Sequence, residues 1–490
     1  MRLSEVAEIV KGRLVLSGET EGEREISALT FDSKTKTKNG LFFCLVGGRA
    51  DGHAYAVEAV KNGAVAIVCQ RQLSIPVPQI LVPSTRGALS ITASHFYGEP
   101  SKALKIIAIT GTNGKTTTAY MLRSILETAG KRVGVIGTLG AVFEGKEWQF
   151  GLTTPDPIYL HFVLSKMQKL GAEYVVMEAS AHALHFEKLA GIRFSACIFT
   201  NLSQDHLDFF KTMPAYKRAK LRLFEGDCLV AVVNGDDETG RAISRLRERE
   251  GGKTVLYGLH TPTDAFAVIT REGLNGTDCM LNVNDKLCKV RLSLVGRHNV
   301  YNALASATCA IELGIDAGAV ASGLTKLKGV KGRLERVAKY RGADVYVDFA
   351  HTPDGLEKSL DALRQHTKSR LICLFGCGGN RDREKRPLMG EIAGKKSDFT
   401  VLTSDNPRYE DPLDILSEIE KGYRKFGSRY VVVPDRARAI EYALQMLGDG
   451  DVLLIAGKGG EDTQEIMGIK YPFDDQTVVE KLTSSWQEGV

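Results

Sequence analysis

The chain has 490 residues, of which 43% are hydrophobic and 25% are charged, and 64 basic against 59 acidic side chains leave a formal net charge of +5. This length exceeds what one hydrophobic core usually serves, so we expect about three domains. With this balance the chain has no polybasic tail, so we expect no nucleic-acid partner. No apolar run reaches the roughly 20 residues of a membrane-spanning helix.

The N-terminal stretch MRLSEVAEIVKG places Glu5 and Glu8 where a signal peptide needs an unbroken apolar run. We therefore expect a cytoplasmic protein. The nine cysteines are scattered from Cys44 to Cys377 without a CxxC pair. This pattern is typical of reduced, buried thiols rather than of disulfides or a zinc site.

The first hundred residues carry short apolar segments, such as GLFFCLVGG and GAVAIVCQ, and end in a turn-rich stretch at residues 97–103. From residue 105 onward, runs rich in β-branched residues (KIIAIT, RVGVIG, EYVVME, SACIFTN, LVAVVNGD) alternate with helical patterns, which predicts βαβ units and a parallel sheet. A basic, glycine-punctuated stretch at residues 326–337 precedes a second such series (DVYVDFA, RLICLFG, DFTVLTS, RYVVVP, DVLLIAG). We therefore predict an α/β protein with domains at residues 1–100, 101–329 and 330–490.

The segment KIIAITGTNGKTTTAYMLRSILETAG, residues 105–130, has the pattern of a strand, a glycine turn and a helix. Backbone N–H groups of residues 111–116 would point at one spot before a helix N-terminus, which favours a polyphosphate. Lys115 would reach the β and γ phosphates, and the Thr116 and Thr117 hydroxyls offer a magnesium ligand. Ile109 replaces the first glycine of the full GxxxxGK[ST] pattern, so a plain strand-to-helix turn is the alternative to an ATP or GTP site.

Polar side chains follow two further strands of this series. Glu178 ends one strand, Asn201 ends the next, and Asp205 and His206 stand in the loop behind it. In parallel sheets the ligand sites lie at these strand ends. A carboxylate and an imidazole would hold Mg²⁺ there, although oxygen ligands are the commoner choice; alternatively, His206 only caps a helix.

Two helical segments further along are ambiguous by themselves. Lys220, in PAYKRAKLRLFEG, has the pattern of an ordinary solvated charge on a helix. Asn299 and Asn302, in GRHNVYNALASA, stand three residues apart at a helix start. They either bracket an adenine ring or cap the helix.

Together, these segments resemble the Mur ligases, ATP-dependent amide-forming enzymes of peptidoglycan synthesis. The resemblance spans essentially the whole chain and rests on seven ordered motifs: TGTNGKTTT, TNLSQDHLD, YKRAKLRLF, GRHNVYNALA, GRLERV, VDFAHTPDGL and FGCGGNRDREKRPLMG. It implies an N-terminal UDP-sugar-binding α/β domain, a central ATP-binding α/β domain with a mainly parallel sheet, and a C-terminal Rossmann-like domain that binds an amino acid. The implied cofactors are ATP and Mg²⁺.

The resemblance also assigns roles to individual residues. ATP binding falls to Gly111, Thr112, Asn113, Gly114, Lys115, Thr116, Thr117, Asn302, Arg333 and Asp348. Binding of the UDP-muramoyl-dipeptide falls to Ser33, Thr153, Thr154, Ser180 and Lys188. Catalysis falls to Lys115, Glu178, His206 and Lys220, with Lys220 carbamylated to N6-carboxylysine and with Thr116, Glu178, His206 and Lys220 as metal ligands.

The stretch DFTVLTSDNPRYEDP, residues 398–412, bears on the choice of amino acid. In the family, a DNPR loop goes with meso-2,6-diaminopimelate, whose second carboxylate a guanidinium grips through two parallel hydrogen bonds. The ammonium group at the end of lysine would be repelled by Arg408. The residues implied for diaminopimelate are Arg381, Asp405, Asn406, Pro407, Arg408, Gly457 and Glu461.

The implied reaction joins meso-diaminopimelate to the D-glutamyl γ-carboxylate of UDP-N-acetylmuramoyl-L-Ala-D-Glu through an acyl phosphate. We expect a monomer that has these small-molecule substrates and no nucleic-acid partner. The alternatives are a lysine-adding ligase, a folylpolyglutamate synthetase-like ligase, a P-loop nucleotide switch, and a silent homologue, which would be expected to lose Lys115 or Lys220. The chain departs from the family pattern at Gly48, Ala181 and Gly460, where histidine, serine and histidine are common.

Overall fold

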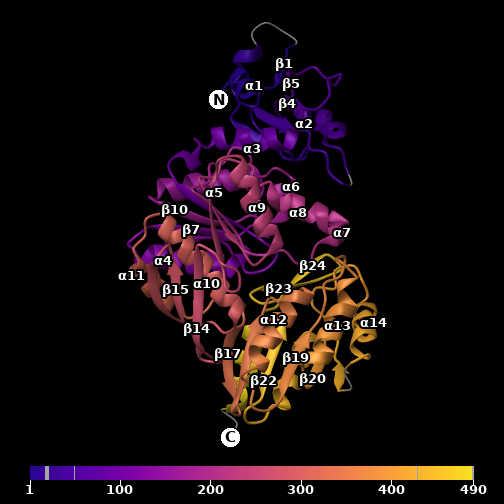
Figure 1. The fold of residues 1–490 in the computed structure, drawn as a ribbon. Helices are drawn as coiled ribbons and strands as arrows, with labels where there is room; N and C mark the ends of the chain where they lie inside the picture. Colours follow the sequence, from indigo (N-terminus) through magenta and orange to yellow (C-terminus); the bar gives the residue numbers. More distant parts are fainter. Residues whose placement is uncertain (17–20, 49, 427–428, 488–490) are drawn as a thin grey trace. The chain divides into compact units, whose positions relative to one another are not determined.

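The computed structural model describes residues 1–16, 21–48, 50–426 and 429–487 and divides into two compact units. The first unit comprises Met1–Ala108, Arg132–Cys197 and Arg222–Leu229, and the second comprises Ile109–Lys131, Ile198–Leu221 and Val230–Val490. Two neighbouring strands, β6 (Lys105–Thr110) and β11 (Ala196–Phe199), run from the first unit into the second. Figure 1 labels the elements along the chain.

The first unit contains two groups of strands with their helices. Its elements are α1 (Leu3–Ile9), β1 (Arg13–Val15), η1 (Glu21–Glu23), β2 (Ala28–Thr30), β3 (Gly40–Phe43), η2 (Gly52–Tyr55), α2 (Ala56–Lys61), β4 (Ala64–Cys69), β5 (Gln79–Leu81), α3 (Thr85–Phe96), η3 (Pro100–Lys102), β7 (Val133–Gly137), β8 (Gly140–Phe143), β9 (Lys146–Trp148), α5 (Pro157–Lys169), β10 (Tyr174–Glu178) and α6 (Ala181–His185). The order β1-β5-β4-β3-β2 is parallel except between β1 and β5. Strand β10 pairs with β7 in parallel, and β8 and β9 continue antiparallel.

Side chains of β3 alternate between two hydrophobic clusters, as the period of a strand requires. Leu41 and Phe43 pack with Leu3 of α1 and Leu89 of α3, whereas Phe42 packs with residues of α2 on the other side. The strand is covered on both faces, which explains why GLFFCLVGG is apolar without a polar residue at every second position.

The second unit contains the longer part of the chain. Its elements are α4 (Lys115–Thr128), α7 (Leu207–Phe210), α8 (Met213–Leu221), β12 (Val230–Asn234), α9 (Glu238–Arg249), β13 (Lys253–Gly258), β14 (Ala265–Gly273), β15 (Gly276–Val283), β16 (Lys286–Leu292), α10 (Arg297–Glu312), α11 (Ala317–Lys326), β17 (Glu335–Tyr340), β18 (Ala343–Asp348), α12 (Pro353–Arg364), β19 (Leu371–Phe375), α13 (Lys385–Lys396), β20 (Phe399–Leu402), α14 (Pro412–Tyr423), β21 (Tyr430–Val432), α15 (Arg436–Gln445), β22 (Val452–Ala456), β23 (Thr463–Ile466), β24 (Ile469–Pro472) and α16 (Asp475–Gln487). Strands β12, β13 and β14 are parallel, and β14, β15 and β16 form an antiparallel meander that the sequence analysis did not identify.

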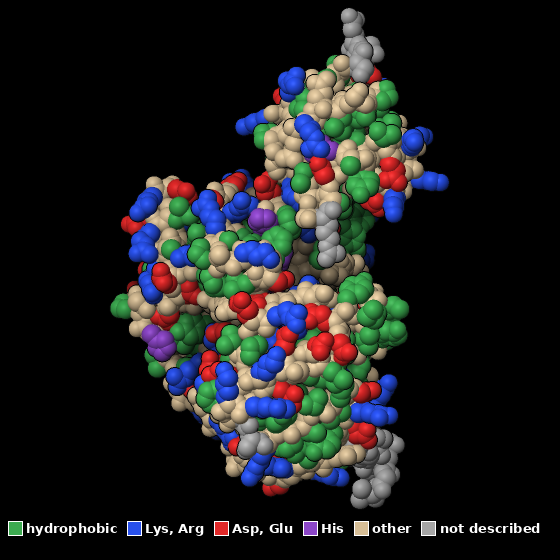
Figure 2. All heavy atoms as spheres, turned by 90° about the vertical axis from the view of Figure 1, so that its right-hand side faces the viewer, with side chains coloured by type: hydrophobic (Ala, Val, Ile, Leu, Met, Phe, Trp, Pro, Cys, Tyr) green, Lys and Arg blue, Asp and Glu red, His purple; other side chains and the backbone are tan. Residues whose placement is uncertain are grey.

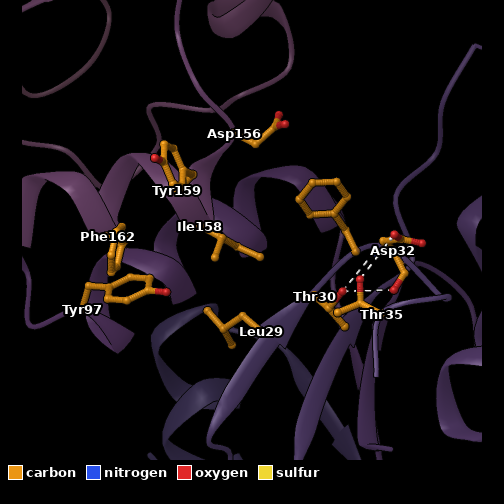
Figure 3. Close-up of a pocket in the computed structure, with 10 residues that line it drawn as sticks. Leu29, Thr30, Asp32, Thr35, Tyr97, Asp156, Ile158, Tyr159 and Phe162 are labelled. Atoms are coloured by element: carbon orange, nitrogen blue, oxygen red, sulfur yellow. Dashed lines mark hydrogen bonds between the residues drawn. The ribbon is translucent and has the colours of Figure 1, made fainter. Parts of the chain in front are cut away.

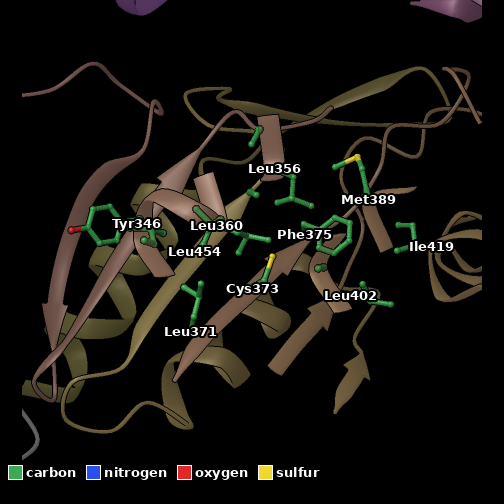
Figure 4. Packing of buried hydrophobic residues seen from close by; sticks show 14 of the residues in the cluster. Tyr346, Leu356, Leu360, Leu371, Cys373, Phe375, Met389, Leu402, Ile419 and Leu454 are labelled. Atoms are coloured by element: carbon green, nitrogen blue, oxygen red, sulfur yellow. The ribbon is translucent and has the colours of Figure 1, made fainter. Parts of the chain in front are cut away.

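Six strands of the second unit form a doubly wound sheet in the order β17-β18-β22-β19-β20-β21, parallel except between β17 and β18. Cys373 and Phe375 of β19 pack under α12 and α13, where Figure 4 shows them with Leu356 and Met389. Ile372, the neighbour of Cys373, packs with α15 on the opposite face. The mainly parallel α/β fold expected from the strand runs is confirmed.

A buried ion pair holds the carboxyl ends of two strands of this sheet. The Arg436 guanidinium donates two 2.7 Å bonds to the Asp475 carboxylate, and both side chains are fully buried. The same guanidinium donates to the carbonyls of Ser404, behind β20, and Ala456, at the end of β22. Arg436 therefore fixes the loops that follow both strands.

Replacing Arg436 with methionine is expected to lower the free energy of unfolding by about 3–5 kcal/mol, because the Asp475 carboxylate would stay buried without its partner. Urea unfolding of the full chain measures the change. The exposed pair of Arg2 and Glu23 supplies the control, since Arg2→Met should leave the midpoint unchanged. Equal midpoints for R436M and the wild type would refute this role of the pair.

All nine cysteines are buried free thiols, as expected from their scatter. No helix within the described ranges combines the length and apolarity needed to cross a bilayer. On the face shown in Figure 2, basic and acidic side chains are interspersed, in line with the balanced composition.

Candidate active site

The predicted phosphate loop lies between β6 and α4 and depends on two glycines. Gly111 and Gly114 have φ of +150° and +87°, which favour glycine. A Cβ on Gly111 would lie 1.9 Å from the Thr200 Oγ1 atom, and a Cβ on Gly114 would lie 2.4 Å from the Asn302 Oδ1 atom. Backbone conformation and space therefore both require glycine at these two positions.

The segment behind β11 holds the phosphate loop in shape. Thr112 N–H donates to the Asn201 carbonyl at 2.8 Å, and Asn113 N–H donates to the Asn201 side chain at 3.0 Å. Thr200 Oγ1 donates to the Asn113 carbonyl at 2.7 Å. Asn201, predicted only as a polar residue at a strand end, thus positions the loop.

Cationic groups converge on this loop. The Lys115 ammonium donates to the carbonyls of Gly111 and Thr112, each at 2.9 Å. Arg333 donates to the Thr116 hydroxyl at 2.8 Å, and its guanidinium lies 4.3 Å from the ring centroid of Phe349. The structure therefore brings Arg333 to the first turn of α4, 217 residues away in sequence.

Asn302 and Asp348, both predicted to contact ATP, are buried and hydrogen-bonded within the protein. Asn302 accepts from Thr118 Oγ1 at 3.3 Å and donates to Asn299 Oδ1 at 3.1 Å. Asp348 accepts from the N–H of Leu334 at 2.6 Å, and its burial raises the pKa of its carboxyl. In this structure Asn302 supports the start of α4, and Asp348 anchors the segment that carries Arg333.

Lys220, in α8, is not a solvated charge, because its side chain is fully buried. Its ammonium donates to the Gly111 carbonyl at 2.7 Å and lies 4.5 Å from the ring centroid of Tyr216. Burial, followed by the charge of Lys115, lowers the pKa of Lys220 well below its ordinary value. A larger fraction of Lys220 is therefore in the neutral amine form than for an exposed lysine.

The loop behind β11 also carries a buried carboxylate that lies near two histidines and a lysine. Asp205 Oδ2 lies 3.3 Å from His206 Nε2 and 3.8 Å from His351 Nε2, and Asp205 Oδ1 lies 3.9 Å from Lys385 Nζ. Burial acts to raise the pKa of Asp205, but the interactions with His351, His206 and Lys385 outweigh it and hold the pKa well below its usual range. His351 and Lys385 were not predicted as site residues.

The unmodified side chains do not make a complete metal site. Across the described ranges, no three His, Cys, Asp or Glu side chains are arranged to hold a metal ion. A divalent cation here would need further oxygen ligands, which phosphates or a carbamate on Lys220 would supply.

In the first unit, Glu178 and the predicted dipeptide-binding residues lie close together. Thr138 donates to the Glu178 carboxylate through its N–H at 3.0 Å and its hydroxyl at 3.2 Å. Thr138 Oγ1 lies 3.2 Å from Thr153 Oγ1, and Thr154 Oγ1 donates to Ser180 Oγ at 3.2 Å. Thr138 therefore binds the carboxylate at the end of β10 directly, and the Thr153 hydroxyl contacts Thr138 in turn.

Lys188 and Ser33, also in the first unit, are engaged in local contacts. Lys188 pairs with Asp156 at 2.7 Å. Ser33 donates to the Glu58 carboxylate at 2.5 Å. All five residues predicted for the UDP-muramoyl-dipeptide lie in the first unit, and all those predicted for ATP and for diaminopimelate lie in the second.

A pocket of about 520 Å³ lies in the first unit. Figure 3 shows the rings of Tyr97, Tyr159 and Phe162 on one side and Thr35, which donates to Asp32, on the other. The full lining is Leu29, Thr30, Phe31, Asp32, Thr35, Tyr97, Asp156, Ile158, Tyr159 and Phe162. Aromatic walls with a few polar groups suit a planar ring.

Arg408 follows β20 in the six-stranded sheet and is held on several sides. Its Nε donates to Glu465 Oε2 at 3.2 Å, and its Nη1 donates to the Gly379 carbonyl at 2.8 Å. The backbone of Arg408 also pairs with β23. A Cβ on Gly378 would lie 2.9 Å from the Arg408 Nη1 atom and 3.7 Å from the Arg381 Cγ atom, so both side chains approach this glycine. Burial, followed by the charge of Arg408, lowers the pKa of Arg381. Two arginine side chains and the Glu465 carboxylate therefore lie together at this part of the sheet edge.

The remaining residues predicted for diaminopimelate lie at the same edge. Asn406 Nδ2 donates to Glu461 Oε2 at 2.8 Å, and Asp405 accepts from the N–H of Asn406 at 2.6 Å. A Cβ on Gly457 would lie 2.5 Å from Asp405. Lys458, which the sequence analysis missed, also donates to Glu461 Oε2, at 3.0 Å.

Three family models match successive parts of the chain, and all three describe Mur ligases. Residues 25–97 match "Mur ligase family, catalytic domain", residues 109–310 match "Mur ligase middle domain", and residues 332–459 match "Mur ligase, glutamate ligase domain". The matches cover three successive parts of the sequence.

Individual relatives agree with the family matches. The chain is 41% identical over 484 residues to a UDP-N-acetylmuramoyl-L-alanyl-D-glutamate--2,6-diaminopimelate ligase of Syntrophomonas wolfei, covering 97% of this chain and 98% of the relative. A solved structure of a ligase of the same name has a TM-score of 0.71 at 30% identity and covers 99% of each chain. The MurF ligase of Thermotoga maritima in complex with ADP has the same fold, with a TM-score of 0.62 at 18% identity over 94% of this chain and 98% of that chain.

Proposed function

This chain belongs to the Mur ligase family, with its three-domain architecture, and we infer that it is the ATP-dependent ligase that joins meso-2,6-diaminopimelate to UDP-N-acetylmuramoyl-L-Ala-D-Glu in peptidoglycan precursor synthesis. The observation that carries the choice of amino acid is that the side chains of Arg381 and Arg408 both approach Gly378. Two cations beside one another suit a substrate with two carboxylates, whereas lysine has one.

ATP activates the D-glutamyl γ-carboxylate. A carboxylate oxygen attacks the γ-phosphorus of ATP, the bond between that phosphorus and the β,γ-bridging oxygen breaks, and ADP leaves with an acyl phosphate formed. Lys115 and Arg333, which meet at the first turn of α4, would neutralise charge on the transferring group. Positioning and electrostatics supply most of the rate enhancement in such transfers.

The amine of diaminopimelate then attacks the acyl carbon, the bond between that carbon and the phosphate oxygen breaks, and inorganic phosphate leaves with an amide formed. The departing phosphate or water takes up the proton that the attacking amine loses. Arg408 and Arg381 would hold the carboxylates of the amino acid, and Asn406 and Glu461 would orient its other polar groups.

Mg²⁺ would neutralise phosphate charge when it is bound. Thr116, His206 and a carbamate on Lys220, all in the second unit, would be its protein ligands there. Carbamylation joins CO₂ to a neutral amine and releases a proton, so the buried, pKa-lowered Lys220 suits it. The product is an anion that supplies the oxygen ligands missing from the unmodified residues.

We propose that the aromatic pocket of the first unit takes the uracil ring of the UDP substrate. Replacing Phe162 with alanine should raise the KM for that substrate about twofold to tenfold, because ring contacts contribute about 0.5–1.5 kcal/mol. Initial-rate measurements that vary each substrate in turn check this. Phe426→Ala, at an exposed ring of the second unit, is the control; an unchanged KM for the UDP substrate in F162A would exclude the pocket.

The proposed reaction is tested by phosphate release from ATP with Mg²⁺ and UDP-N-acetylmuramoyl-L-Ala-D-Glu, run with meso-diaminopimelate and with L-lysine. We expect release with diaminopimelate and little with lysine, and the product mass should increase by one diaminopimelate residue. If no phosphate is released with either amino acid, the ligase activity is refuted. If phosphate is released with lysine alone, the assigned specificity for diaminopimelate is refuted.

We further propose that the enzyme is a monomer. We also propose that it acts in the cytoplasm, because ATP and UDP-linked precursors are available there. Light scattering during gel filtration should give the mass of one chain, 53.5 kDa. A mass of twice that value would contradict the monomer, and recovery in the membrane fraction of lysed cells would contradict the location.

A further inference from the structure

Lys458, two residues behind β22, has a fully buried side chain. Its ammonium donates to the Thr463 carbonyl at 2.6 Å, to Glu461 Oε2 at 3.0 Å and to Asn406 Oδ1 at 3.4 Å. An ammonium group has three N–H donors, and each finds an acceptor here. Burial of a cation is costly unless it is paired in this way, so the position of Lys458 is tied to these partners.

These contacts fix the orientation of Asn406. Its Oδ1 faces two donors, Lys458 Nζ and the N–H of Glu465, the latter at 2.9 Å. The other side of the amide, Nδ2, must then face Glu461 Oε2, to which it donates at 2.8 Å. A flipped amide would turn its N–H groups toward the Lys458 ammonium, so the lysine excludes that orientation.

The contacts also orient Glu461. Within the described part of the chain, the hydrogen bonds to this carboxylate from Lys458 and Asn406 both end at Oε2. The side chain remains 37% exposed, so its second oxygen is available to a ligand. A carboxylate held in this way can accept from an ammonium group without losing side-chain freedom on binding.

We propose that Lys458 is a positioning residue for the amino-acid substrate: acting through Glu461 and Asn406, it holds the carboxylate that receives an ammonium group of diaminopimelate. This inference rests on the proposed function. It adds a residue that contacts no reacting atom but determines the geometry of two that are expected to touch the substrate.

A double-mutant cycle with Lys458→Met and Glu461→Gln tests the inference. We expect K458M to raise the KM for diaminopimelate about tenfold, with the KM values for ATP and the UDP substrate changed less than about twofold. If Lys458 acts through Glu461, the double variant should be less impaired than the product of the two single effects. Lys470→Met, at an exposed residue of β24, is the matched control and should leave every KM unchanged.

Thermal unfolding of each variant separates positioning from folding, and K458Q, which keeps a shorter donor, takes the place of K458M if that variant does not fold. Two results with an active wild type would overturn this inference and leave the proposed function standing. In the first, the effects of K458M and E461Q multiply in the double variant. In the second, K458M raises all three KM values equally. A wild-type enzyme without diaminopimelate-dependent phosphate release would overturn the proposed function together with it.

Discussion

Replacing Lys220 with alanine is expected to lower kcat at least about a hundredfold, the size of effect seen when one preorganised charge is removed from a transition state. The side chain is fully buried beside the Gly111 carbonyl and the Tyr216 ring. Alanine cannot form the carbamate that would complete the metal ligands. Phosphate release at saturating substrates measures the change.

Two comparisons separate the carbamate from a simple loss of packing. Lys217→Ala removes a partly exposed lysine of the same helix and should keep full activity. Removal of dissolved CO₂ should lower the wild-type rate, and bicarbonate should restore it, with no effect on K220A. A wild-type rate that does not respond to CO₂, together with an active K220A, would exclude the modification.

Arg408→Ala is expected to raise the KM for meso-diaminopimelate at least about tenfold, which corresponds to about 1.4 kcal/mol. The substitution removes the guanidinium that we propose to bind the distal carboxylate of this substrate. It also leaves the Glu465 carboxylate without the guanidinium that it contacts at 3.2 Å, so a second anion would face the substrate. Initial rates over a range of diaminopimelate concentrations check the value.

The double variant R408A/E465Q separates these two contributions, because it removes the unpaired carboxylate as well. Its KM should lie between those of the wild type and R408A. Arg424→Ala, at an arginine 67% exposed on its side chain, is the control. An R408A enzyme with the wild-type KM would show that the loop does not select the amino acid.

Much of the fold was predictable, because strands buried on both faces give continuous apolar runs that stand out in a sequence. All ten runs singled out in the two series, from KIIAIT to DVLLIAG, contain a strand of the structure. The antiparallel β15 was missed although its residues alternate between buried and half-buried along its length. Its sequence, GTDCMLNV, mixes Thr and Cys into the buried positions, which hides the period.

The local geometry of the candidate site was predictable where it depends on a short sequence pattern, as at Lys115 and the two glycines of the loop. It was not predictable where burial results from distant contacts. Lys458 looks like an exposed charge between glycines, because Asn406 lies 52 residues earlier in the chain. The partner of Arg408, Glu465, is 57 residues away. The resemblance to the family named Lys220, but only the structure shows that its side chain is buried.

The nine buried thiols can report local unfolding of the protein through their labelling rates. A thiol-reactive dye needs both access and the thiolate, and burial raises the pKa of Cys44 and of Cys377 to about 12. Labelling under native conditions therefore proceeds only through local unfolding, and its rate reports the free energy of that event. Because Cys44 follows β3 and Cys377 follows β19, mass analysis of labelled peptides would follow each sheet separately, with and without substrates, in the unaltered protein.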